Sequence, residues 1–298
     1  MSRLLDFVLV PLSYGFMQRA LLIAILVGAV CAVLSCYLVL KGWSLMGDAI
    51  SHAVLPGLVV AVVLGLPLAV GAMAAGLTCA LLTGYLKERS RVKEDTVMGI
   101  VFSGMFGLGL VLFTKIETDQ HLLHVLFGNL LGVTPQDVVE TAIVAGITLV
   151  AVALKRRDLL VYCFDPQHAR SIGLPVALLH YGLLILLSLT IVASLKAVGI
   201  ILVVAMLVAP GAIAQLLTNR FDRMLLIALA VAIGSCVVGT LASFHIDGST
   251  GPCIVLVQAA AFVLALLFAP GSGLLRRPRA AAAGDGPATP PLPSDGRP

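Results

Sequence analysis

The sequence predicts an all-α polytopic membrane protein, with eight or nine transmembrane helices in one continuous membrane domain over residues 1–275. Hydrophobic residues make up 60% of the 298-residue chain and charged residues only 11%, and the mean hydropathy is +1.09. Soluble domains carry about 25% charged residues, so this composition excludes a soluble globular protein. Apolar stretches also recur at about the 20-residue length that crosses roughly 30 Å of hydrocarbon. The expected spans are residues 16–40, 45–66, 68–86, 97–114, 138–154, 176–195, 198–217, 224–244 and 254–269.

The basic residues predict how these spans are oriented, because short cytoplasmic loops retain Lys and Arg. Fifteen of the 19 Lys and Arg residues fall at Lys41, in 87–93, 155–170 and 220–223, and in the tail from 276. Nine spans with these segments inside leave the N-terminus outside, with residues 1–17 as a short interfacial or half-inserted helix. The net charge of +4 reflects this asymmetry and offers no contiguous basic face for nucleic acid.

The second span begins with the sequence GDAISHAVLPG, which contains Asp48 and His52. A spacing of four residues places both side chains on one helix face, where a carboxylate and an imidazole can bind the same divalent cation. An ionisable side chain at membrane depth costs about 2.5 kcal/mol or more on insertion scales, so the pair predicts a functional site. The alternative is that Asp48 caps the helix, but Ser51 occupies the position where a capping box needs Glu or Gln.

Proline and glycine interrupt the spans at Pro56-Gly57, 65–67 and Pro210-Gly211. Such breaks line the pathway of some transporters and are packing kinks in other helices, and the sequence leaves both interpretations open.

His121 and His124 in an outer connection are interpreted as structural.

Residues 158–175, DLLVYCFDPQHARSIGLP, are too polar to cross the membrane. Asp165 followed by Pro166 is typical of a helix start, and Gly173 of a helix end about two turns later. The segment 164–174 is therefore expected to be a short cytoplasmic helix, either a docking element for another protein or an interfacial connector. Further along the chain, His180 is interpreted as a satisfied helix histidine, and Asp247 as either an entrance ligand or a solvated loop carboxylate.

The remaining features predict little chemistry. The N-terminus lacks a cleavable signal pattern, so the first span is expected to remain as an anchor. The six cysteines form no C-x-x-C pair and are expected to pack as small hydrophobic residues. Residues 276–298, rich in Pro and Gly, are expected to form a disordered cytoplasmic tail.

Four stretches of this sequence resemble the permease subunit of ATP-binding-cassette (ABC) importers for manganese, iron and zinc. They are GDAISHAVLPG, FDPQHARSIGLP, VGIILVVAMLVAPGAIAQLL from 198 to 217, and LFGNLLGVT from 126 to 134. The resemblance covers residues 16–269, and WSLMGDAISHAVLPG is more similar to the manganese/iron branch than to the zinc branch. It implies a vitamin-B12-importer-like permease that works as a dimer in a bacterial inner membrane.

The resemblance also implies partners and site residues. Asp48 and His52 would bind the transported Mn²⁺, Fe²⁺ or Zn²⁺, with Asp247 as a further metal residue, and no cofactor is held permanently. The docking segment would contact a cytoplasmic ABC ATPase through Asp165, Gln167, Ala169, Arg170 and Gly173. An extracytoplasmic metal-binding protein would deliver the ion, and the second permease would be the same chain or a paralogue.

Several observations separate this interpretation from its alternatives. The chain contains no G-x-x-x-x-G-K-[ST] phosphate loop, so ATP hydrolysis would belong to a separate subunit and the chain itself is not an enzyme. An intramembrane metalloprotease would need an H-E-x-x-H motif, which is also absent. An ion-coupled secondary transporter would show inverted repeats, which are not detectable. A cobalamin or ferric-siderophore ABC permease would leave Asp48 and His52 without a role.

Overall fold

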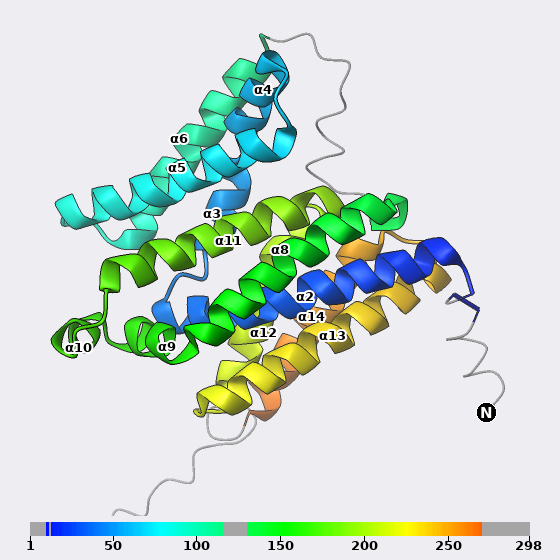
Figure 1. Ribbon diagram of the computed structural model, residues 1–298. Helices are drawn as coiled ribbons and strands as arrows, with labels where there is room; N and C mark the ends of the chain where they lie inside the picture. Colours follow the sequence, from blue (N-terminus) through cyan, green and yellow to red (C-terminus); the bar gives the residue numbers. More distant parts are fainter. Residues whose placement is uncertain (1–9, 12, 116–129, 270–298) are drawn as a thin grey trace, which may run out of the picture.

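The computed structural model describes residues 10–11, 13–115 and 130–269, and this part of the chain is built from α-helices joined by short turns (Figure 1). Nine helical segments in it are long and apolar enough to cross a membrane. They are α2 (Gly15–Lys41), α3 with α4 (Met46–Ala53 and Leu55–Leu64), α5 (Leu68–Arg89), α6 (Glu94–Phe113), α8 (Pro135–Leu154), α11 (Val176–Val198), α12 (Ile200–Leu217), α13 (Phe221–Ile246) and α14 (Thr250–Phe268). The shorter elements are the 3-10 turn η1 (Leu130–Gly132), α9 (Arg156–Phe164) and α10 (Pro166–Ser171).

The predicted all-α membrane fold is therefore confirmed, and nine is the number of candidate spans in the described residues. The prediction of a separate interfacial or half-inserted helix over residues 1–17 is wrong at its end, because Phe16 and Met17 already belong to α2. Its beginning, and the tail predicted at 276–298, lie outside the described residues, as do His121 and His124.

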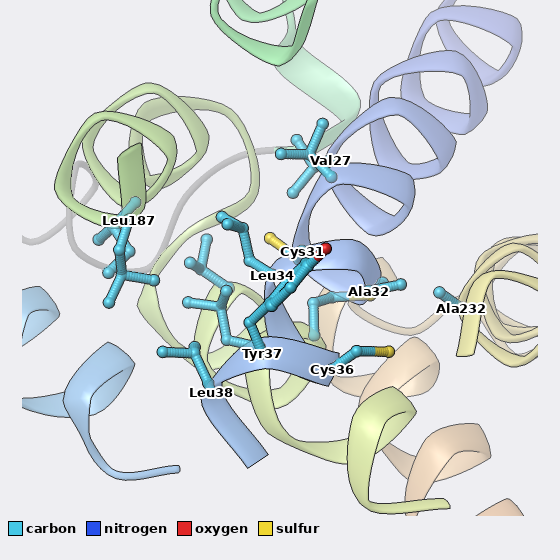
Figure 2. Close-up of a cluster of buried hydrophobic side chains, with 14 of the residues drawn as sticks. Val27, Cys31, Ala32, Leu34, Cys36, Tyr37, Leu38, Leu187 and Ala232 are labelled. Carbon is cyan, nitrogen blue, oxygen red and sulfur yellow. The ribbon is translucent and has the colours of Figure 1, made fainter. Parts of the chain in front are cut away.

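Helix α2 is the centre of the bundle and packs against α12, α13, α8 and α9. Buried side chains occur all around it, as expected of a helix that is apolar on every face. Figure 2 shows Leu34 and Leu38 pointing towards Leu187 of α11, while Ala32 and Cys36 point towards Ala232 of α13. The cysteines behave as the sequence predicts: all six are free, five are buried and Cys253 is half-buried.

Helices α4, α5 and α6 form a group beside this bundle, and they join it through α3 and through contacts of α5 with α11 (Figure 1). Gly57 of α4 and Gly71 of α5 let the two backbones touch. A Cβ atom added to Gly57 would lie 2.1 Å from the Gly71 carbonyl oxygen and 2.6 Å from the Cβ of Ala75. Close packing through glycine is a common device between membrane helices and explains the glycine of the Pro56-Gly57 break.

We expect Gly57→Ala to destabilise the protein by about 1–3 kcal/mol, because the new methyl group meets backbone that cannot move without separating α4 from α5. Gly146→Ala is the matched control, since a Cβ atom on Gly146 of α8 would meet nothing within 4 Å. Thermal unfolding in nanodiscs should show a lower Tm for Gly57→Ala and an unchanged or higher Tm for Gly146→Ala. Equal Tm values for the two variants would contradict this account of the glycine contact.

Packing also explains Pro210-Gly211, inside α12. The Gly211 amide donates a hydrogen bond to the Ser35 hydroxyl of α2 at 2.9 Å, and the Ser35 hydroxyl lies 3.3 Å from the Val208 carbonyl oxygen. Ser35 therefore gives the Gly211 amide, directly after the proline, a hydrogen-bond partner from a neighbouring helix. Gly65 lies in the turn between α4 and α5 with φ of 64°, so the predicted break at 65–67 is a loop between two helices.

The segments predicted to be cytoplasmic gather at one end of the bundle, which we call the basic end. It contains Lys41, residues 87–93, α9 with α10, and the connection between α12 and α13 (Figure 1). An ion pair between Arg156 of α9 and Asp222 of α13 joins two of these segments.

Candidate functional site

Helix α3 carries Asp48 and His52, and its neighbours place it at mid-height in the bundle. A Cβ atom on Gly47 would lie 2.8 Å from Leu207, near the middle of α12. A Cβ atom on Gly76, in the middle of α5, would lie 3.2 Å from Ile50. We refer to α3 as the metal helix and to Asp48 with His52 as the metal pair, after the role that the sequence predicts for them. The pair thus lies far from both ends of the spans, although the chain enters α3 only a few residues after α2 has ended.

Proline ends the metal helix directly after the pair. Pro56 has no amide hydrogen, so the regular helical bond to the carbonyl of residue 52 cannot form. The helix breaks at Val54, and α4 begins at Leu55. The interruption is local, because Val54 keeps helical angles (φ −66°, ψ −26°), and the metal pair lies in the segment before it.

The geometry of the metal pair orients the imidazole. His52 Nδ1 lies 3.0 Å from the backbone carbonyl oxygen of Asp48 and 3.3 Å from its carboxylate Oδ1. A carbonyl oxygen only accepts hydrogen bonds, so a neutral His52 carries its proton on Nδ1 and leaves the lone pair on Nε2 available. Ligating histidines are commonly fixed in this way by a carbonyl on the other ring nitrogen. The Asp48 side chain caps no helix, since the N-cap residue of α3 is Leu45.

The metal pair is neither buried in the core nor fully open. The side chain of His52 is 33% exposed and that of Asp48 is 37% exposed. Two phenylalanines of α6 cover the imidazole, with ring centroids 6.0 Å (Phe102) and 5.5 Å (Phe106) from that of His52. An exposed carboxylate at mid-membrane cannot face lipid at an acceptable cost, so this side of α3 must face a water-filled path or another subunit.

One chain supplies only part of a metal site. Among the residues that the structure describes, no group of three or more His, Cys, Asp or Glu side chains is placed to hold a metal ion. Asp48 and His52 offer two ligand side chains, whereas hard divalent ions such as Mn²⁺ take about six ligands. A complete site therefore needs water, backbone oxygen or a second chain.

The structure does not bring Asp247 to the metal pair. Asp247 is the exposed residue that follows α13, with φ of 55°, the left-handed conformation of a helix C-cap. Aspartate and asparagine adopt this conformation more readily than most residues. Local backbone geometry is thus sufficient reason for an aspartate here.

The docking segment forms the predicted short helix, α10, at the basic end. The Asp165 carboxylate accepts hydrogen bonds from the amides of Gln167 (2.9 Å) and His168 (3.0 Å). These two hydrogen bonds hold the pKa of Asp165 below its usual range, and the bond from the His168 amide has the larger effect. At the other end Gly173 has φ of 80°, and the Leu174 amide donates to the Ala169 carbonyl oxygen.

The predicted docking residues differ in accessibility. Asp165, Gln167, Arg170 and Gly173 are exposed, whereas Ala169 is fully buried and faces the protein interior. Sequence reasoning did not single out Phe164 and Ile172, which flank α10 and are 79% and 54% exposed. Large apolar side chains exposed on a polar segment are a signal that could have identified them. Phe102 and Phe106 were also missed, because their role depends on the packing of α6 against α3.

The fold and the site define a membrane permease subunit, with an Asp48–His52 pair inside one span, a short capped helix at the basic end and no G-x-x-x-x-G-K-[ST] loop in the sequence. The chain belongs to the ABC 3 transport family, whose sequence profile matches residues 13–269. It is similar to the chelated iron transport system membrane protein YfeD of Yersinia pestis, with 64% identity and 90% of both chains covered. It is also 53% identical to the manganese transport system membrane protein MntB of a Synechocystis strain, covering 89% of this chain and 87% of that one.

A solved structure agrees with these relatives. PsaBC from Streptococcus pneumoniae, in complex with Fab, matches with a TM-score of 0.79 and 37% identity, over 90% of this chain and 96% of that chain. The resemblance to metal ABC permeases is thereby confirmed. The chain is the multi-pass membrane subunit of an ABC transporter and not its ATPase, and the ion-coupled secondary transporter is excluded.

Proposed function

We propose that this chain imports Mn²⁺ or Fe²⁺, and that the ion passes through a site formed by Asp48 and His52. The observation that carries the proposal is the half-exposed metal pair at mid-height in the membrane domain. Carboxylate and imidazole ligands suit these ions, and no cysteine thiol lies in α3 to retain a soft metal. The names of the relatives, which refer to chelated iron and to manganese transport, support the same cargo.

A second permease subunit would complete the site. Two chains related by a dyad would contribute two carboxylates and two imidazoles, and each would cover the other's exposed pair. The partner is either a second copy or a paralogue. In Yersinia pestis, two different chelated iron transport system membrane proteins, YfeD and YfeC, are 64% and 44% identical to this chain.

The energy would come from an ATPase that contacts α10. Exposed Phe164 and Ile172 provide apolar contact area there, and Arg170 provides charge. A cavity of about 630 Å³ adjoins α10, with Asp165 and His168 on one side and the connection between α12 and α13 on the other. An extracytoplasmic binding protein would deliver the ion at the opposite end.

Other cargoes remain as alternatives. Zinc uses the same nitrogen and oxygen ligands and usually binds more tightly than Mn²⁺ or Fe²⁺. Cobalamin or a ferric siderophore would need a wide path and would give Asp48 and His52 no role. Uptake of ⁵⁴Mn²⁺ into vesicles containing the complete transporter tests the proposal. Competition by Fe²⁺ together with insensitivity to a siderophore or cobalamin is the expected result, and competition by the large ligand alone would overturn it.

We expect His52→Cys to make manganese uptake more sensitive to zinc. A thiolate at this position favours retention of Zn²⁺ and converts a transient site into a trap. The measurement is the zinc concentration that halves ⁵⁴Mn²⁺ uptake, at matched expression. Cys79 is present in both proteins, with its Sγ 4.0 Å from the Ala49 carbonyl oxygen. A difference in zinc sensitivity between them is therefore not due to this native thiol. Equal zinc sensitivity in variant and parent would show that His52 does not lie on the path of the ion.

A further inference from the structure

Four residues form a cluster of aromatic and basic side chains between the docking helix α10 and the metal helix α3. We call it the relay cluster: Lys41 at the end of α2, Trp43 in the turn before α3, Tyr162 on α9 and His180 on α11. Trp43 and Tyr162 are only 3% and 2% exposed, whereas Lys41 and His180 are half-buried, so the aromatic part of the cluster lies in the interior. None of its members belongs to the metal pair or to the docking helix.

The contacts within the relay cluster are close and specific. The Tyr162 hydroxyl and His180 Nδ1 lie 2.8 Å apart, which is hydrogen-bond distance. The rings of Trp43 and His180 meet edge to face, with centroids 5.2 Å apart. The Lys41 ammonium lies 4.3 Å from the centroid of the Tyr162 ring and 5.7 Å from that of Trp43, in the range of cation–π attraction. Each member therefore touches at least one other from a different helix or turn.

The cluster is continuous with the metal helix on one side. The Met46 amide, the first of α3, donates a hydrogen bond to the Trp43 carbonyl oxygen at 3.0 Å. Asp48 follows two residues later. A displacement of Trp43 therefore moves the start of the helix that carries the metal pair.

The relay cluster is also continuous with the docking helix. Tyr162 lies in the last turn of α9, which ends at Phe164. The Asp165 amide donates to the Val161 carbonyl oxygen at 2.9 Å, and Asp165 is the N-cap of α10. A tilt of α10 is thus transmitted to the Tyr162 side chain through two short, hydrogen-bonded turns.

One buried group of the cluster has no hydrogen-bond partner in the described part of the chain. The indole N–H of Trp43 is buried and has no hydrogen-bond partner among the described residues. Buried donors are almost always paired, so this N–H is available to a partner that the described residues do not supply. Coupling between distant sites requires an element with two discrete arrangements, and the relay would use such an element at this donor.

We propose that the relay cluster transmits the position of the docking helix to the metal helix, with the Tyr162–His180 contact as its positioning element. This inference rests on the proposed function, because it takes α10 as the ATPase contact and Asp48 with His52 as the ion site. Linkage makes the effect reciprocal: engagement of the ATPase changes metal affinity, and bound metal changes the affinity for the ATPase state that engages it.

Tyr162→Phe tests the relay, because it removes the hydroxyl and keeps the ring under Lys41. The complete transporter, with its ATPase and binding protein, is reconstituted in nanodiscs, and ATP hydrolysis is measured with and without Mn²⁺-loaded binding protein. We expect basal hydrolysis to stay within about twofold and the stimulated-to-basal ratio to fall about fivefold, the effect of one net hydrogen bond. Tyr85→Phe is the matched control, since the Tyr85 ring on α5 contacts Arg89 at 4.5 Å; its ratio should not change.

Substitutions of His180 separate positioning from packing. His180→Asn keeps a polar atom near the Nδ1 position and should retain most of the stimulated-to-basal ratio, whereas His180→Leu should lower it as Tyr162→Phe does. If the two residues act through one contact, the double variant Tyr162→Phe/His180→Leu loses no more than either single variant. Additive losses, or equal losses in Asn and Leu variants, would overturn the positioning role.

Asp48→Asn in the same preparation distinguishes failure of the relay from failure of the proposed function. Loss of stimulation in Asp48→Asn with a normal ratio in Tyr162→Phe would overturn the relay and leave the ion site intact. Normal stimulation in Asp48→Asn would overturn the proposed function, and the relay with it. A Tyr162→Phe variant that lowers basal and stimulated hydrolysis in equal proportion would also contradict the relay.

Discussion

Asp48→Asn is expected to reduce metal uptake by at least about tenfold to 100-fold, because even the loss of an outer-shell partner of a metal ligand has an effect of that size. The change removes the negative charge and keeps the size of the side chain. The hydrogen-bond contact between His52 Nδ1 and the Asp48 backbone carbonyl oxygen remains available. The fold should be retained, since the carboxylate is 37% exposed and caps no helix. Uptake of ⁵⁴Mn²⁺ into vesicles is the measurement.

Asp95→Asn, at the exposed start of α6, is the matched control for the loss of one carboxylate. It should transport at the parental rate. Both variants should assemble with the ATPase in pull-down experiments. Parental uptake by Asp48→Asn would show that the ion does not pass the metal pair.

Ala169→Pro should disconnect ATP hydrolysis from transport. Ala169 is fully buried, and its amide donates to the Asp165 carbonyl oxygen at 3.0 Å, the first helical bond of α10. Proline removes this donor and clashes with the preceding turn, at a cost of about 3 kcal/mol in a helix interior. A helix of six residues cannot absorb that cost and will lose its shape at the proposed ATPase contact. The measurement is the number of Mn²⁺ ions imported per ATP hydrolysed.

Ala169→Gly keeps the amide donor and is the control at the same position. Its cost is about 1 kcal/mol, so it should import with an intermediate efficiency. Wild-type stoichiometry in Ala169→Pro would contradict a coupling role for α10, even if hydrolysis itself were slower.

The sequence was sufficient for the spans because apolar length and charge asymmetry are local properties. It was sufficient for the docking helix as well, because Asp165, Pro166 and Gly173 are cap signals that act within one or two turns. Asp48 and His52 were singled out as candidates for a related reason: an ionisable pair inside an apolar run is unusual whatever the fold.

Features that depend on contacts between distant segments could not be predicted. The height of the metal helix in the bundle could not be predicted from the sequence, because it depends on the packing of Gly47 against Leu207. Nothing in the sequence around His180 indicates which residues it contacts. In the structure its ring meets that of Trp43, more than a hundred positions earlier in the chain. The inward direction of Ala169 likewise follows from how α10 packs and not from its own six residues.

The central claim is that a transported ion binds His52 at mid-height in the membrane domain. Pulsed electron paramagnetic resonance of Mn²⁺ in the reconstituted transporter, with the permease labelled with ¹⁵N-histidine, tests this claim directly. The account predicts a ¹⁵N hyperfine coupling to bound Mn²⁺ that disappears in His52→Ala and persists in His168→Ala, a histidine on α10. A coupling that is absent in the parent, or that survives in His52→Ala, would contradict the claim.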